Sequence, residues 1–373
     1  MKKSLPAVYV IFAVSIAAAA CWLFIFARRS ILFWGAAPAL SAALAVIFAL
    51  LCAAAICLRP IPVKVSAVAV LYLLIFSVIS ETAGAVLRAA APGSAVLAAV
   101  DSGVPVLVIT VLLLAYGWVH GKKTVLKRYG IVSARFPEGM KLRVALVSDV
   151  HMGFSVDEAR LSEQCARISK ESPDILVITG DLVDDQTAPE QMAAACRLLG
   201  AITTTCGAYF IYGNHDLAQR GPKLRFSRGQ YEDALRENGI NILADTCLEA
   251  GGALIAGRLD AGLTVRSGRK TIKELLNGAD MAKPVILLDH QPLEVKEAAR
   301  LGVALMLSGH THGGQVWPVG LLSQLASKGL CYGDHVVDGM HIIITSGLGN
   351  RGNRLRSGCT AETVIIDITG TGK

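Results

Sequence analysis

Long apolar stretches near the N-terminus constrain the fold of this chain more than any other feature. A helix that spans the hydrocarbon core of a bilayer needs about 20 mainly apolar residues. The first 130 residues contain four stretches of this kind. They are Leu5 to Phe26, Ile31 to Leu58, Ile61 to about Ser80, and Val104 to Val119 with its flanks. The sequence therefore predicts an N-terminal bundle of about four transmembrane helices over residues 1–130.

The charge distribution supports a division of the 373-residue chain near Gly130. Up to that residue there are 11 Lys and Arg against 2 Asp and Glu, whereas the rest of the chain has 25 against 27. The basic excess lies at the edges of apolar segments, where lipid headgroups and membrane topology explain it. We therefore expect membrane lipids as partners, no nucleic-acid partner, and a second domain of ordinary soluble composition over residues 136–373.

The positions of the basic residues also predict an orientation. With four spans and a cytoplasmic N-terminus, the inner segments contain Lys2, Lys3, Arg59, Lys64, Lys122, Lys123, Lys127 and Arg128. The outer loops then contain only Arg28, Arg29 and Arg88. The positive-inside rule predicts a multi-pass protein of the cell membrane with its second domain in the cytoplasm. This prediction requires an even number of spans, and the Ala-rich stretch from Glu81 to Ser102 either contains another span or lies on the surface.

Beyond Arg135, short β-like runs alternate with helical ones. The runs that we interpret as buried strands are Arg143 to Ser148, Ile175 to Thr179, Ala208 to Tyr212, Pro284 to Leu288, Val303 to Ser308, His341 to Thr345 and Glu362 to Ile368. A helical pattern runs from Asp157 to Lys170. Strands and helices in alternation predict an α/β domain with helices on the faces of the sheet.

Polar residues of the kind that bind metals follow five of these strands. They are Asp149 and His151, Asp181 and Asp184, Asn214, His215 and Asp216, Asp289 and His290, and finally His310 and His312 in a glycine-rich turn. Sites of this kind assemble at strand ends. Imidazole and carboxylate together suit Zn, Fe, Mn or Ni, and the absence of thiolates argues against a structural zinc site.

Each of these groups has a simpler explanation when it is taken alone. Asp and Gly are common turn residues, and a single histidine such as His290 is commonly structural. In an extended segment alternate residues point the same way, so we expect Asp149 and His151 to face one ion together. The joint occurrence of all five groups favours a metal site.

The set D-x-H, G-D-x-x-D, G-N-H-D, H and G-H-x-H, in this order, resembles the calcineurin-like metallophosphoesterases. The GHTHGGQ form at Gly309 to Gln315, with the DHQP block at Asp289 and the SGLG run at Ser346, is most similar to the bacterial membrane-associated branch of that superfamily. The resemblance covers roughly residues 140 to 370. It implies a β-sandwich flanked by helices and a pair of divalent metal ions, with Mn, Zn or Fe as candidates.

The resemblance also implies a role for each residue of the set. Asp149, His151 and His312 would hold the first metal, Asn214, His290 and His310 the second, and Asp181 would bridge both. His215 would donate a proton to the leaving group, helped by Asp216. Two divalent ions can clamp a phosphoryl group and activate water between them.

The predicted activity is therefore the metal-dependent hydrolysis of a phosphomonoester or phosphodiester. The membrane part makes a lipid-linked or cell-envelope substrate attractive. The alternative is a non-catalytic phosphoesterase fold that acts as a scaffold or sensor on a functional membrane domain. The complete ligand set argues against it, as does the near absence of acidic residues in the spans, where only Glu81 and Asp101 are candidates.

Two further segments have open interpretations. Arg354 and Arg356 either contact a substrate phosphate by paired hydrogen bonds or are solvated loop charges. The apolar stretch from Trp317 to Leu325 either lies against a bilayer or packs on the core of its own domain.

Overall fold

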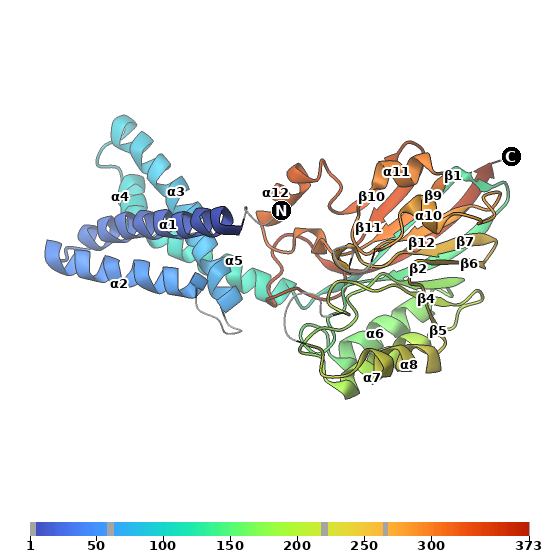
Figure 1. Cartoon of the computed structure of the whole chain (residues 1–373). Coiled ribbons are helices and arrows are strands. Elements are labelled where there is room, and N and C mark those ends of the chain that lie inside the picture. The colour runs from blue at the N-terminus through green and yellow to red at the C-terminus, as the bar shows by residue number, and fades with distance from the viewer. Residues whose placement is uncertain (1–4, 58–62, 218–222, 264–267, 373) are drawn as a thin grey trace. The chain divides into compact units, whose positions relative to one another are not determined.

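A computed structural model describes residues 5–57, 63–217, 223–263 and 268–372 of the chain (Figure 1). It has two compact units, Met1–Val119 and His120–Lys373. This division precedes the predicted one near Gly130, because the strand β1 (Thr124–Pro137) belongs to a sheet of the second unit. In the sequence, Lys127 and Arg128 of β1 resemble the charged flank of a membrane span, which explains the misplaced boundary.

The first unit consists of helices. They are α1 Leu5–Phe33, α2 Pro38–Cys57, α3 Val63–Ala90, α4 Ala95–Ser102 and α5 Val104–His120. Among the described residues, α1 and α3 are long and apolar enough to cross a membrane. Helices α4 and α5, which meet at an angle of 62°, make a third candidate if they form one broken span. The four predicted spans would require the shorter apolar helix α2 to cross as well. Of the residues behind the predicted orientation, Lys2, Lys3 and Arg59 lie outside the described residues.

The interpretation of Arg28 and Arg29 as loop charges is wrong, because both lie within α1. Nη1 of Arg29 is 2.8 Å from Oε2 of Glu81 and 3.1 Å from Oδ1 of Asp101. Arg88 lies 2.8 Å from the same oxygen of Asp101. Opposite charges that pair on otherwise apolar helices lower the cost of placing them there. The stretch that contains the two acids continues α3 and then forms α4, whose eight residues are too few for a separate span.

The second unit has two six-stranded mixed sheets, ordered β1-β12-β2-β3-β4-β5 and β10-β11-β9-β8-β7-β6. The remaining strands are β2 Lys141–Val147, β3 Ile175–Ile178, β4 Ala208–Phe210, β5 Ile240–Ile242, β6 Thr246–Ala250, β7 Ala253–Gly257, β8 Val285–Leu288, β9 Val303–Ser308, β10 Gly333–Val337, β11 Met340–Ile344 and β12 Ala361–Gly372. The helices are α6 Glu158–Ser169, α7 Pro189–Gly200, α8 Arg228–Glu237, α10 Ile272–Leu275, α11 Val295–Arg300 and α12 Val319–Ala326, with short 3-10 turns η1 Ala261–Leu263 and η2 His312–Gly314.

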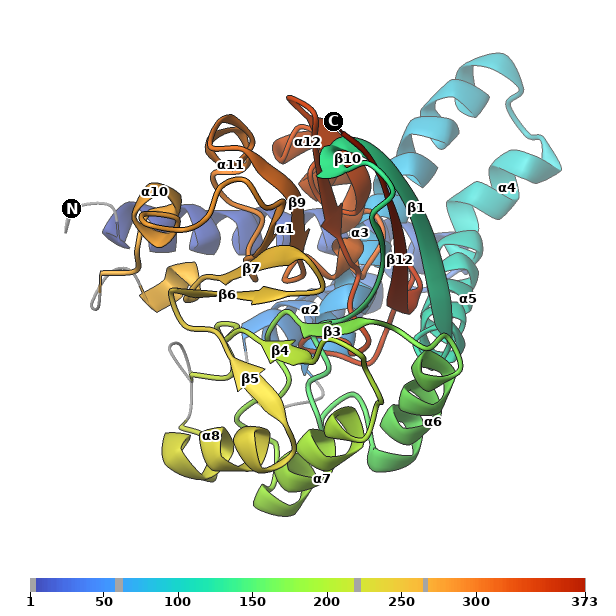
Figure 2. The same cartoon turned by 90° about the vertical axis from the view of Figure 1, so that its right-hand side faces the viewer.

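The two sheets pack face to face, and helices cover their outer faces. In β2, Val144 and Leu146 pack in the core between the sheets, whereas Ala145 and Val147 pack in the core that contains residues of α6, α7 and α8. This alternation follows from the two-residue period of a strand. Figure 2 shows these three helices together beside β3, β4 and β5. A third core joins β7, β8 and β9 to α10 and α11. The predicted β-sandwich flanked by helices is confirmed.

Candidate metal centre

The polar groups found in the sequence follow β2, β3, β4, β8 and β9. Strands β2, β3 and β4 are parallel neighbours in one sheet, and β8 and β9 are parallel neighbours in the other. The loops after parallel strands meet at one edge of a sheet. Backbone hydrogen bonds join these loops, since Asp149 N–H donates to Gly180 O at 2.9 Å and His151 N–H donates to Asp181 O at 3.1 Å.

The backbone of this edge is strained. Five of the predicted ligands have a positive φ, namely Asp149 (52°), His151 (48°), Asp181 (54°), His310 (70°) and His312 (50°). Residues other than glycine seldom adopt this conformation, and such outliers gather at functional sites. The expectation that Asp149 and His151 share an extended segment is therefore wrong, although their side chains do come together.

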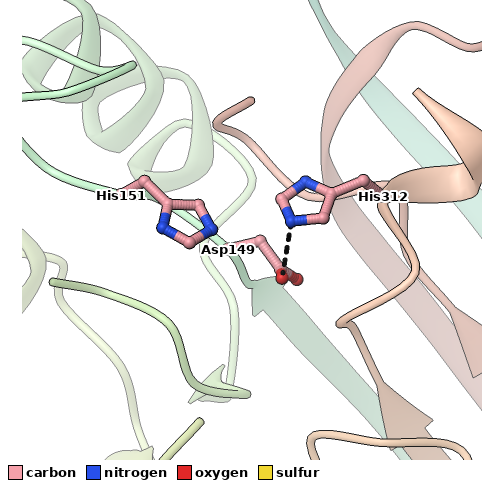
Figure 3. Close-up of side chains that lie close together, drawn as sticks. All are labelled: Asp149, His151 and His312. Atoms are coloured by element: carbon pink, nitrogen blue, oxygen red, sulfur yellow. Dashed lines mark ion pairs between the residues drawn. The ribbon is translucent and has the colours of Figure 1, made fainter. Parts of the chain in front are cut away.

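The first group of candidate ligands consists of Asp149, His151 and His312 (Figure 3), whose ligand atoms all lie within 4.8 Å of one another. Nε2 of His312 is 3.4 Å from Oδ1 of Asp149. Nδ1 of His151 lies 3.4 Å from Oδ2 of Asp184. A carboxylate behind a histidine in this way fixes the ring so that the other nitrogen faces a metal.

The second group consists of Asp181, His290 and His310, again with ligand atoms within 4.8 Å. Nε2 of His290 is 3.2 Å from Oδ2 of Asp181 and 3.3 Å from Nδ1 of His310. Nδ1 of His290 donates to Thr179 O at 2.7 Å, which leaves Nε2 as the nitrogen that faces the candidate metal site. The same Asp181 oxygen is 3.9 Å from Nε2 of His151, which places Asp181 between the two groups.

Buried polar atoms without a hydrogen-bond partner test whether these residues fit metal ions. Among the described residues such atoms include Oδ1 of Asn214 and Nε2 of His151, His215 and His312. Each unpartnered buried polar atom costs about 1–3 kcal/mol, so their concentration at one edge indicates ligand atoms arranged for cations. Imidazole nitrogens with carboxylate and amide oxygens are a donor set that suits divalent metals.

Comparisons with known proteins agree with this geometry. Residues 142–314 match the family model described as calcineurin-like phosphoesterase. The chain is 30% identical over 271 residues to an uncharacterized metallophosphoesterase of Aquifex aeolicus, and the match covers 71% of this chain and 99% of the relative. The chain belongs to the calcineurin-like phosphoesterase family.

A second relative is named as a transmembrane protein. The chain is 31% identical over 271 residues to a transmembrane protein with metallophosphoesterase domain from Danio rerio. The match covers 70% of this chain but only 61% of that relative. Among solved structures, a purple acid phosphatase from yellow lupin seeds is similar with a TM-score of 0.38 at 14% identity, covering 63% of this chain and 55% of the other.

The carboxylates and histidines of the metallophosphoesterase domain shift one another's pKa. Burial raises the pKa of Asp181, but the neighbouring His290 outweighs it and holds that pKa well below the ordinary value. Burial lowers the pKa of His312 to about 3, against the opposing charge of Asp149. Asp181 is therefore ionised and His312 is neutral, and these are the forms in which these two side chains bind metal.

His215 lies beside the two groups. Its ring meets the ring of His151 edge to face, with centroids 5.0 Å apart. Its backbone N–H donates to Oδ1 of Asp181 at 2.8 Å, which fixes the loop after β4 against the metal centre.

Asp216 has contacts that differ from its predicted role as a helper of His215. Its carboxylate accepts hydrogen bonds from the backbone N–H groups of Asp181, Leu182, Val183 and Gly213 at 2.7–3.1 Å and from the hydroxyl of Tyr231 at 3.1 Å. Burial and the nearby charge of Asp181 raise the pKa of Asp216 to about 7. These contacts make Asp216 a positioning residue for the loop that carries Asp181. The sequence offers no signal for Tyr231 as its partner.

Both interpretations of Arg356, as a phosphate contact and as a solvated loop charge, are wrong. Its side chain is fully buried and donates to Oδ1 of Asn350 at 2.8 Å and to the carbonyl oxygens of Ser346 and Gly349 at 3.0 and 2.7 Å. Arg356 therefore holds the loop after β11 together from the inside. Arg354 is exposed, and its Nε donates to Phe154 O at 3.1 Å.

Asp289, which precedes His290, is held by two arginines. Arg258 and Arg269 each lie 3.0 Å from its carboxylate, and all three side chains are buried. Burial raises the pKa of Asp289 to about 6 against the opposing effect of the two arginines. The cluster fixes the start of the loop that presents His290.

Proposed function

We propose that this metallophosphoesterase is a membrane-anchored hydrolase that uses two divalent cations, with Mn, Zn or Fe as candidates, to cleave a phosphomonoester or phosphodiester. The observation that carries the proposal is the meeting of two ligand groups at one carboxylate, Asp181, which lies between His151 and His290. The GHTHGGQ sequence at Gly309 to Gln315 and the apolar helices support a place in the membrane-associated branch of the family.

The ligands divide between the cations as the two groups do. Asp149, His151 and His312 would hold one cation, His290, His310 and Asn214 would hold the other, and Asp181 would bridge them. When bound, the pair would supply the Lewis acidity that polarises the phosphoryl oxygens and activates water.

The chain's own residues handle the proton and the charge of the leaving group. Nε2 of His215 is buried and has no hydrogen-bond partner among the described residues, so it is available to an ester oxygen at the metal centre. A proton from this nitrogen lets the ester oxygen leave as an alcohol rather than as an alkoxide. Asp216 holds the loop of Asp181 while this happens, and Asp184 fixes the ring of His151.

The membrane helices support a substrate that is lipid-linked or part of the cell envelope. The chain would be a multi-pass protein of the cell membrane, with the metallophosphoesterase domain on the cytoplasmic side. Helices α1 and α3, which are long and apolar enough to cross a bilayer among the described residues, would provide the anchor.

The test uses the full chain in detergent, stripped of metal and reloaded with Mn²⁺, Zn²⁺ or Fe²⁺. Hydrolysis of a chromogenic phosphodiester and of a chromogenic monoester is measured for the wild type, for His310→Ala and for His341→Ala. His341 is a matched control, because it is a half-buried histidine on β11 that pairs with Asp334 rather than with the metal centre. Metal-dependent turnover that only His310→Ala abolishes supports the proposal. Turnover that persists in His310→Ala contradicts it.

A further inference from the structure

Helix α12 is an apolar helix with none of its eight residues buried. Leu321, Leu322 and Leu325 are 55%, 61% and 70% exposed, and Trp317 just before the helix is also exposed. The interpretation that this stretch packs on its own core is therefore wrong. A helix that exposes so much apolar surface in water is unfavourable, because each leucine gains about 1.5–3 kcal/mol when it is fully buried. A partner outside the domain's own core would therefore stabilise this helix.

The helix is attached directly to the loop that carries His312. A Cβ atom added to Gly314 would collide with the backbone of Gly320 in α12, so the two backbones approach as closely as only glycines allow. A cavity of about 470 Å³ lies beside this contact. Its walls include Gly313 and Gly314 of the loop that carries His312, Trp317 and Leu321 from the α12 segment, and Lys127 of β1. A volume of this size suits a ligand of several tens of atoms.

The charges around the helix indicate what kind of surface it contacts. Lys127 lines the cavity and Lys328 follows α12 closely, and both are exposed. The segment from Trp317 to Leu330 contains no acidic residue. An apolar helix with a Trp at one end and Lys at its border is typical of helices that lie in the headgroup region of a bilayer.

The chain itself keeps a bilayer close to the domain. Helix α5 ends at His120 and β1 begins at Thr124, so only three residues separate the last helix of the first unit from the first strand of the metallophosphoesterase domain. If α4 and α5 form one broken span, a linker this short keeps the domain close to the bilayer without a separate association step.

From these observations we infer that α12 lies in the lipid headgroup region and guides the phosphate of a membrane lipid through the adjoining cavity to the metal centre. The inference rests on the proposed function and names its substrate class. The lipid's acyl chains remain along the leucines of α12, and the ammonium group of Lys127 attracts its phosphate into the cavity. Water then adds to phosphorus, the bond from phosphorus to the ester oxygen breaks, and that oxygen leaves with a proton.

The position of α12 is tested first, and without any catalysis. The full chain is placed in nanodiscs of phosphatidylcholine and phosphatidylglycerol with brominated acyl chains. The bromine atoms quench the fluorescence of nearby tryptophan side chains. The difference between the emission of wild type and of Trp317→Phe isolates Trp317 from the tryptophans of the helical unit. We expect this difference to be quenched in brominated discs relative to plain ones. Unquenched Trp317 emission overturns the inference. If, in addition, chemical cross-linking of the sample yields dimers, the helix is assigned to an interface with a second copy of the chain.

The substrate class is tested by rate ratios. The rate of hydrolysis of phosphatidic acid, and that of phosphatidylglycerol, is measured in nanodiscs. Each rate is divided by the rate for a soluble chromogenic ester under the same conditions. Leu322→Gln/Leu325→Gln is compared with Val132→Gln/Val336→Gln, a control pair of similar exposure, 68% and 61%, on β1 and β10. We expect the α12 pair to lower the ratio at least about tenfold and the control pair to leave it unchanged.

The outcomes separate this inference from the proposed function. Turnover of the chromogenic ester without turnover of either lipid overturns the lipid substrate and leaves the hydrolase intact. An unchanged ratio in the α12 pair overturns the role of the helix. If quenching of Trp317 is seen but the wild type cleaves no ester at all, the proposed function fails and with it the substrate class, while the membrane position of α12 stands.

Discussion

Replacing Asp216 with Ala tests whether this residue organises the metal centre. The substitution removes the acceptor of four buried backbone N–H groups and of the Tyr231 hydroxyl. A buried donor without a partner costs about 1–3 kcal/mol. At the lower end of that range, the four amides alone give a loss of about 4 kcal/mol. This is a large part of the roughly 5–15 kcal/mol that stabilises a typical domain.

The assay is thermal unfolding of the metal-free full chain in detergent, followed by circular dichroism. For a domain of 150–250 residues, about 1 kcal/mol shifts the midpoint by roughly 2–4 °C, so we expect Asp216→Ala to melt about 8–16 °C lower. Asp233→Ala is the control, because Asp233 is exposed on α8 and its ion pair with Arg236 is long at 3.5 Å. It should shift the midpoint by only about 1–2 °C. An equally small shift for Asp216→Ala would refute the positioning role.

Three more changes have defined outcomes. Gly213→Ala should weaken Mn²⁺ binding at least about tenfold in titration calorimetry, because its Cβ would collide with Oδ1 of Asp181, whereas Gly130→Ala, with open space around its Cβ, should bind normally. Arg356→Met should lower the free energy of unfolding by about 3 kcal/mol in urea titrations, because three buried acceptors lose their donor; an unchanged midpoint would contradict this. Burial raises the pKa of Glu232, but hydrogen bonds from Tyr212, Arg228 and Arg236 outweigh it and lower that pKa to about 2. Glu232 therefore stabilises the fold above its unfolded pKa and loses this effect as the pH falls from about 4.5 toward 2, so Glu232→Gln should melt below wild type at pH 7 and approach it at acidic pH.

Most strands with continuous apolar runs could be predicted from the sequence, although the buried strand β7 was missed, and strands with mixed runs could not. All seven predicted strands are present. In β3, β8, β9 and the second half of β2, continuous apolar residues are buried on both faces, which makes these strands easy to find. The strand β1 was missed since its exposed face carries Lys127 and Arg128. The strand β5 has only three residues, and Asn241 interrupts its apolar run.

The candidate ligands could be predicted because histidine, aspartate and asparagine at consecutive strand ends are unusual in combination. Their backbone conformation could not, since the positive φ of Asp149 and His151 is imposed by hydrogen bonds from their N–H groups to the neighbouring loop. Arg356 was misinterpreted because charged loop residues are usually solvated, and only the folded loop brings the carbonyl oxygens of Ser346 and Gly349 around its guanidinium. Contacts between segments that are distant in the sequence determine both the backbone conformation of Asp149 and His151 and the burial of Arg356.

The metal content of the purified full chain tests the two-cation centre most directly. After metal removal and reloading with Mn²⁺, bound metal is measured by elemental analysis for the wild type, for Asp181→Asn and for the exposed control Asp233→Asn. Because Asp181 lies between the two ligand groups, a bridged centre predicts two ions per chain in the wild type and the control, and at most one in Asp181→Asn. A wild type that binds no more than one ion, or an Asp181→Asn variant that keeps two, would contradict it.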